Sequence, residues 1–145
     1  MRTHLARTGR GLSVPGKGRT GVAAERTYAR VSGWIFLALG TAGLLTRDLG
    51  HMLQVGGILA PVHLAIGLAG IATANRGGVR ARRIFNLTLG CLLTAWGVAG
   101  TLEAPLLSPA PLPLENGLHA LIGIWGFYGP LGALWAKWTR RKPAA

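Results

Sequence analysis

Acidic residues are scarce in this chain, and their scarcity sets the first limits on its class. Asp and Glu together number 4 against 16 Lys and Arg, and charged residues make up only 14% of the sequence. Because a soluble domain contains about 25% charged residues, we predict that most of this chain lies in a membrane. The net charge of +12 would suit nucleic acid. However, the cations lie almost entirely outside the apolar segments, so we predict no specific nucleic-acid partner.

Cysteine is nearly absent, and recognisable catalytic motifs are missing. Cys91 is the one cysteine in the sequence, which excludes an intramolecular disulfide and leaves the redox compartment undetermined. It falls within an apolar run, where a small packing role is expected. The sequence holds no complete catalytic motif, metal cluster or nucleotide-binding loop. We therefore predict that the protein is not an enzyme and carries no metal.

The N-terminal region lacks an apolar block. Residues 1–30 hold seven Lys or Arg and one Glu, and a stretch rich in Gly, Ser and Thr lies around residues 12–21. This composition predicts a basic, disordered arm over residues 1–27. The hydrophobic region of a signal peptide is also missing, so we expect no cleavage there.

Four apolar segments follow, each close to the roughly 20 residues that cross a bilayer as a helix. We predict helices at about residues 31–46, 55–74, 84–102 and 117–136, in a domain of residues 28–138 with a basic tail over 139–145. Pro61 lies inside the second segment, which either kinks there or begins there. Four prolines within residues 103–116 predict an extended, stiff loop. The predicted fold is all-α, a polytopic four-helix transmembrane bundle.

Lysine and arginine are distributed unevenly among the connections. The first 30 residues hold seven, the turn at residues 75–83 holds four, and residues 137–142 hold four. The loops at residues 47–54 and 103–116 contain only Arg47. Because short loops rich in these residues stay in the cytoplasm, both termini are expected on the cytoplasmic side. The same charges favour contact with anionic lipid at the basic termini.

An internal repeat divides the chain into two halves. The segment HLAIGLAG begins at His63, and HALIGIWG begins 56 residues later, at His119. The preceding helices agree loosely, with Arg26 and Gly43 echoed by Arg80 and Gly97. We therefore predict two tandem helical hairpins, related by a pseudo-twofold axis along the membrane normal.

The repeat motifs also carry a resemblance. RTYARVSGWIFLALGTAG, the two His-Gly motifs and ENGLH resemble a bacterial family of four-helix integral membrane proteins that is catalogued as a domain of unknown function. The resemblance covers roughly residues 26–138. It implies a multi-pass protein of the bacterial inner (cell) membrane and supplies no established activity. An Asn commonly stands three residues before each His in that family; Asn116 matches, whereas Ala60 stands at the corresponding position of the first hairpin.

Two histidines within apolar segments are candidate functional residues. On a helix, positions i, i+4 and i+7 share a face, so each histidine begins a stripe that continues in two glycines. The stripes are His63, Gly67, Gly70 and His119, Gly123, Gly126. Glycines let a neighbouring helix approach closely, and a polar ring within a span is expected to point into the bundle. We therefore expect these helix-packing stripes to face one another across the bundle.

The role of the histidines stays open at this stage. Each imidazole can bond a carbonyl or hydroxyl of an adjacent helix and pin the hairpins together. Alternatively, His63 and His119 can supply the axial nitrogens of a haem. Glu115 stands four residues before His119, so a proton relay between them is possible, although the same carboxylate also favours a helix N-terminus. With Asn116, these residues form a possible polar cluster.

The predicted function is a non-enzymatic structural or accessory membrane subunit, because glycine-lined helices support packing in lipid. Its expected partners are the lipid bilayer, a second copy of the chain in a homo-oligomer, or another membrane protein. The alternatives are a small transport or proton-conducting unit and a haem-binding membrane redox protein. Apart from haem in that last alternative, we predict no cofactor.

Overall fold

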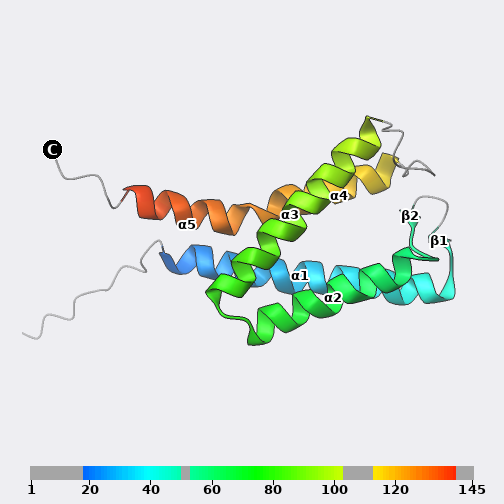
Figure 1. The fold of residues 1–145 in the computed structure, drawn as a ribbon, viewed down its shortest axis with the longest axis horizontal. Helices are drawn as coiled ribbons and strands as arrows, with labels where there is room; N and C mark the ends of the chain where they lie inside the picture. The colour runs from blue at the N-terminus through cyan, green and yellow to red at the C-terminus, as the bar shows by residue number, and fades with distance from the viewer. Residues whose placement is uncertain (1–17, 50–52, 103–112, 140–145) are drawn as a thin grey trace, which may run out of the picture.

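A computed structural model describes residues 18–49, 53–102 and 113–139, and this part of the chain is mostly helical. Its elements follow in the order α1 (Gly18–Leu45), β1 (Asp48–Leu49), β2 (Leu53–Gln54), α2 (Leu59–Arg76), α3 (Val79–Thr101), α4 (Pro113–Gly126) and α5 (Tyr128–Thr139). Figure 1 shows α1 and α2 running side by side, with α3 crossing them towards α4. The predicted proline-rich loop falls mainly within residues 103–112, outside the described residues.

Three helical segments among the described residues are long and apolar enough to cross a membrane. They are Thr20–Leu45, Val79–Thr101 and Pro113–Thr139, the last of which combines α4 and α5. The predicted membrane character of the chain is therefore supported at this level. Helix α2 is not among the three, since its 18 residues include Asn75 and Arg76 in the last turn.

Helix α1 begins at Gly18, so the predicted disordered arm was wrong for residues 18–27. The sequence around Glu25 was predicted to be disordered because it contains no apolar block. Its buried residues are separated by charged ones and follow a helical spacing. Gly21, Glu25 and Tyr28 share one face at intervals of four and three residues, and all three are buried. A β-carbon added to Gly21 would lie 3.5 Å from the carbonyl oxygen of Gly129 in α5. This face packs while the charged residues between stay outside.

The last predicted span is broken between α4 and α5. Pro130 has no N–H to donate to the carbonyl of Gly126, and its ring would clash with that carbonyl in a continuous helix. The amide of Phe127 instead bonds the carbonyl oxygen of Ile124 at 3.1 Å, and α5 begins at the next residue. The predicted last span, at about residues 117–136, therefore lies within the apolar segment Pro113–Thr139, and the break at Phe127 was not predicted.

A short antiparallel ladder joins α1 to α2, where the sequence predicted only a polar connection. Asp48 pairs with Gln54 and Leu49 with Leu53. The buried Val55 then donates its amide to the carbonyl oxygen of Arg47 at 3.1 Å. Helix α2 starts at Leu59, so Pro61 lies in its first turn, where a missing N–H does no harm. This agrees with the alternative in which the helix begins near Pro61.

The helices pack chiefly in two pairs, α1 with α2 and α3 with α4. Glycines bring each pair into backbone contact. A β-carbon at Gly40 would lie 2.6 Å from the amide nitrogen of Leu64, and one at Gly97 would lie 2.7 Å from that of Ala120. Such distances are too short for any side chain, so glycine is required at both places. Gly97 of α3 thus makes the same kind of contact as Gly40 of α1. The sequence repeat paired Gly97 with Gly43 instead, which lies about one helical turn further along α1.

Candidate functional site: a cavity between the two hairpins

A cavity of about 680 Å³ lies between α1, β2, α2 and α4. It exists because α4 packs closely on α3 but makes little contact with α1. Its walls are almost entirely apolar. The lining residues are Ile35, Phe36, Leu39, Leu53, Gln54, Val55, His63, Glu115, Leu118, His119, Leu121, Ile122 and Trp125. The volume is within the usual range of small-molecule sites, about 300–1,000 Å³.

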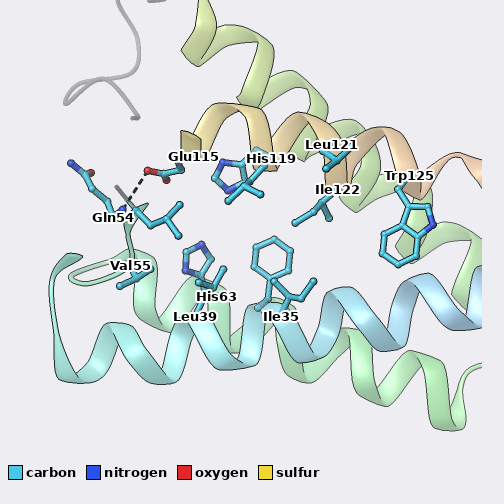
Figure 2. Close-up of a pocket in the computed structure, with 13 residues that line it drawn as sticks. Ile35, Leu39, Gln54, Val55, His63, Glu115, His119, Leu121, Ile122 and Trp125 are labelled. Atoms are coloured by element: carbon cyan, nitrogen blue, oxygen red, sulfur yellow. Dashed lines mark hydrogen bonds between the residues drawn. The ribbon is translucent and has the colours of Figure 1, made fainter. Parts of the chain in front are cut away.

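The two histidines meet at this cavity from opposite sides. Figure 2 shows His63 of α2 and His119 of α4 across the gap from one another. His63 is buried and His119 is partly buried. In both rings Nδ1 is buried and has no hydrogen-bond partner within the described residues. Neither imidazole is therefore held by a carbonyl or hydroxyl of a neighbouring helix, the pinning role considered from the sequence.

An aromatic ring supports His63 from the side of α1. The ring centroids of Phe36 and His63 lie 5.4 Å apart with a tilt of 39°. Phe36 is only 1% exposed and belongs to the buried core with Tyr28, Leu89 and Leu93. Because this core fixes Phe36, it also restricts the orientation of the imidazole beside it.

Glu115 lies at the end of the cavity next to β2. The backbone N–H of Gln54 donates to Oε2 of Glu115 at 3.4 Å, as drawn in Figure 2. Glu115 as a whole is 6% exposed. Glu115 is also the first-turn acidic residue of α4, so it interacts favourably with the positive end of the helix dipole. It thus contributes both to the helix N-terminus and to the polar end of the cavity.

Asn116 lies apart from the other members of the predicted polar cluster. Its buried side-chain amide packs against Gly100 of α3, and a β-carbon at Gly100 would collide with it. Ala60 occupies a similar place in the first hairpin, where its methyl group would lie 2.9 Å from a β-carbon at Gly43. The cavity therefore brings together His63, His119 and Glu115, while Asn116 packs inside its own hairpin.

The two glycine stripes do not face one another, contrary to our expectation. A β-carbon at Gly67 would lie 2.5 Å from the amide nitrogen of Leu37 in α1. One at Gly123 would lie 2.5 Å from that of Thr94 in α3. Gly70 is likewise buried, against Ala29 and Gly33 of α1. Gly126 is buried against Asn86 of α3 and Tyr28 of α1. Gly67 and Gly123 therefore each close their own hairpin, whereas Gly126 also meets Tyr28 of the other hairpin, and the histidines line the space between the hairpins.

A buried charge at the other end of the bundle was missed by the sequence reasoning. Glu25 is fully buried, and Nε of Arg83 donates to its Oε1 at 3.0 Å. The side-chain amide of Asn86 donates to the carbonyl oxygen of Glu25 at 3.0 Å. The helical spacing of Gly21, Glu25 and Tyr28 was the signal that could have found it. Its neighbours come from α1, α3 and α5, so this cluster ties the two hairpins together.

The cavity offers little to a metal or a haem. No group of three His, Cys, Asp or Glu residues that could hold a metal ion occurs in the described chain. A haem bound through both histidines would carry propionate groups, which cations usually pair with. Within the described residues, the cavity lining contains the carboxylate of Glu115 and no Lys or Arg. The charge of the site is therefore unsuitable for an anionic ligand.

Comparison with known proteins gives no relative for this chain. No family model matches it, and neither a curated protein nor a solved structure matches it. The resemblance to a bacterial four-helix membrane family stays a prediction, and the function rests on the geometry of the site.

Proposed function

We propose that the chain is a four-span membrane protein made of two repeated hairpins, with α2 as the fourth span. The antiparallel packing of α2 along α1 supports this, because a helix in such contact with a membrane span shares its depth. The similar glycine contacts of Gly40 and Gly97 support the repeat. With four spans both termini lie on one side, which the distribution of Lys and Arg makes the cytoplasmic side of a bacterial inner membrane.

The function that the geometry supports best is binding, without catalysis, of a small apolar molecule taken from the membrane. The observation that carries this proposal is the cavity between the hairpins, with apolar walls and polar groups gathered at one end. Tight glycine packing keeps each hairpin closed, so the space between hairpins is a feature of their arrangement and not of loose packing within them. Such a protein would serve as a structural or accessory subunit. It would act as a homo-oligomer or in contact with another membrane protein.

Lipid can reach this site from the side. Leu121 is 66% exposed and Leu118 is 37% exposed, although both line the cavity. Exposed apolar side chains at the rim of a cavity suit an opening towards hydrocarbon, where they cost nothing. A ligand dissolved in the bilayer would thus enter between α4 and α1 without crossing the polar connections.

The test is to identify what copurifies with the protein. Organic extracts of the wild type and of Ile122→Trp and Leu39→Trp, which fill the cavity, would be compared by mass spectrometry. Leu68→Trp is the matched control, because Leu68 is exposed on α2 and does not line the cavity. We expect one class of apolar molecule to be enriched with the wild type and the control and lost from both cavity variants. Equal extracts from all four folded proteins would refute the proposal.

A further inference from the structure

We infer that the ligand is a neutral ring with hydrogen-bonding oxygens at opposite ends and a hydrocarbon tail, the chemistry of an isoprenoid quinone or its quinol. This inference rests on the proposed binding function and specifies the ligand class for the same cavity. It follows from the charge of the lining, from the placement of the two histidines and from the shape of the apolar walls.

The charge of the cavity selects against ionised head groups. Its described lining includes one carboxylate, that of Glu115, and no Lys or Arg. A fatty acid or phospholipid head would bring a negative charge beside Glu115 with no cation to pair it, which is costly in a site of low polarity. An alkylammonium head would find Glu115 but would leave the imidazole N–H groups without an acceptor. A neutral head group with oxygen acceptors avoids both problems.

The two histidines provide hydrogen-bonding groups on opposite walls of the cavity. A neutral imidazole carries one N–H donor and one acceptor nitrogen. His63 and His119 stand on opposite walls, and no hydrogen bond joins either Nδ1 to another described residue. Nδ1 of each ring is itself buried, so a ligand in the cavity would bond the two imidazoles through their other ring nitrogen. Buried polar groups usually have partners, and a ligand can supply one to each ring. A ligand with a single hydroxyl would form a hydrogen bond with only one of the two histidines. A ring with oxygens at opposite ends would form one with each.

The remaining walls match a flat ring followed by a hydrocarbon chain. Phe36 stands beside His63 and offers an aromatic face to a ring, and aromatic pairs contribute beyond the area they bury. Away from the histidines, the walls continue in Ile35, Ile122 and Trp125. These side chains suit a tail, and the exposed Leu121 marks where the tail would pass into lipid.

The experiment is a binding titration of the purified full-length protein in detergent, followed by native mass spectrometry. The probes share one alkyl chain and differ in head group: decylbenzoquinone, its reduced quinol, decanol and decylamine. We expect the quinone or the quinol to bind one copy per protein, and decanol and decylamine to bind at least about tenfold more weakly, the effect of one lost hydrogen bond of about 1.4 kcal/mol. The comparison of quinone with quinol shows which form fits better.

Variants separate this inference from the proposed function. His63→Leu and His119→Leu should each weaken binding of the preferred ring by about tenfold, while His63→Gln, which keeps a donor, should retain more affinity than His63→Leu. Thr41→Val is the control, because Thr41 is exposed on α1 and bonds only its own helix. If decanol or decylamine binds as tightly as the ring, or folded histidine variants bind it unchanged, the ligand class is wrong although the cavity binds apolar molecules. If no probe binds and Ile122→Trp copurifies with the same molecules as wild type, the proposed function itself fails.

Discussion

Arg83 of α3 donates from Nε to Oε1 of Glu25 in α1 at 3.0 Å, and this pair fastens one hairpin to the other. The acid is fully buried, whereas the Arg83 side chain is 37% exposed. Removing the cation would leave a carboxylate buried without its partner. Removing the acid would leave an arginine that can turn towards water, so the two changes are not equivalent.

We predict that Arg83→Ala destabilises the protein by about 2 kcal/mol. Breaking a fully buried pair costs about 3–5 kcal/mol, and the partial exposure of Arg83 reduces this figure. Thermal unfolding in detergent, followed by circular dichroism, is the measurement. Arg80→Ala is the control, because Arg80 is an exposed residue of the same helix. Equal melting temperatures for the two variants would show that the pair contributes nothing.

Alanine at the close-contact glycines should be destabilising. A β-carbon at Gly67 would lie 2.5 Å from a backbone nitrogen of α1, and one at Gly97 would lie 2.5 Å from the carbonyl oxygen of Asn116. Because backbone cannot give way as a flexible side chain can, we expect Gly67→Ala and Gly97→Ala each to cost about 1–3 kcal/mol. Gly132→Ala has open space around it and should be neutral or stabilising by up to about 1 kcal/mol.

The same thermal assay ranks these glycines against the histidines. His63→Leu removes no close backbone contact, and its Nδ1 leaves no hydrogen-bond partner stranded among the described residues. We therefore expect it to be milder than Gly67→Ala. A His63→Leu variant that unfolds before Gly67→Ala would mean that the imidazole supports the fold more than the cavity geometry implies.

Truncation should distinguish the two parts of the basic N-terminal region. Deleting residues 1–17 removes none of the described contacts, and membrane yield should be retained. Deleting residues 1–27 removes Glu25 and the first turns of α1 that pack on α5, so we expect a marked loss of yield. Western blots of isolated membranes measure both. Equal yields from the two truncations would contradict the packing of this part of α1.

Reporter fusions test the proposed topology. A reporter active only in the cytoplasm should give signal when fused after Arg83 or after Ala145, and none when fused after Ser108. The reason is that Lys and Arg are concentrated just before Arg83 and near the C-terminus, and are missing from the connection that contains Ser108. Signal after Ser108, with loss of signal after Arg83 and after Ala145, would show that α2 does not span the membrane.

Helical periodicity was enough to predict the buried face of α2. The intervals from His63 to Gly67 and Gly70 placed all three on one face, and each of them is buried. The same reasoning stopped short of Glu25, because a single acid among cations was treated as part of a polar arm. Its burial depends on Arg83 and Gly129, which stand far along the chain and become its neighbours only after folding.

The cavity could not be predicted, because it depends on how one hairpin lies against the other. The glycine stripes indicated close packing but not its partner, and Gly123 proved to meet α3 within its own hairpin. The spacing of Glu115 and His119 did place both at one end of α4, where they line the cavity. That His63 would stand opposite them depends on the angle between hairpins, which no local pattern encodes.

Pro130 breaks the last helical segment close to the end of the cavity. On one side of the break at Phe127, α4 packs on α3, and on the other side α5 packs mainly on α1. The segment Pro113–Thr139 therefore changes its main partner along its length: it lies away from α1 at the cavity and meets α1 again at Trp125, whose ring packs on Tyr28 with the centroids 5.1 Å apart. The cavity therefore ends where Trp125 packs on Tyr28, and the break at Phe127 that Pro130 imposes lies two residues beyond that contact.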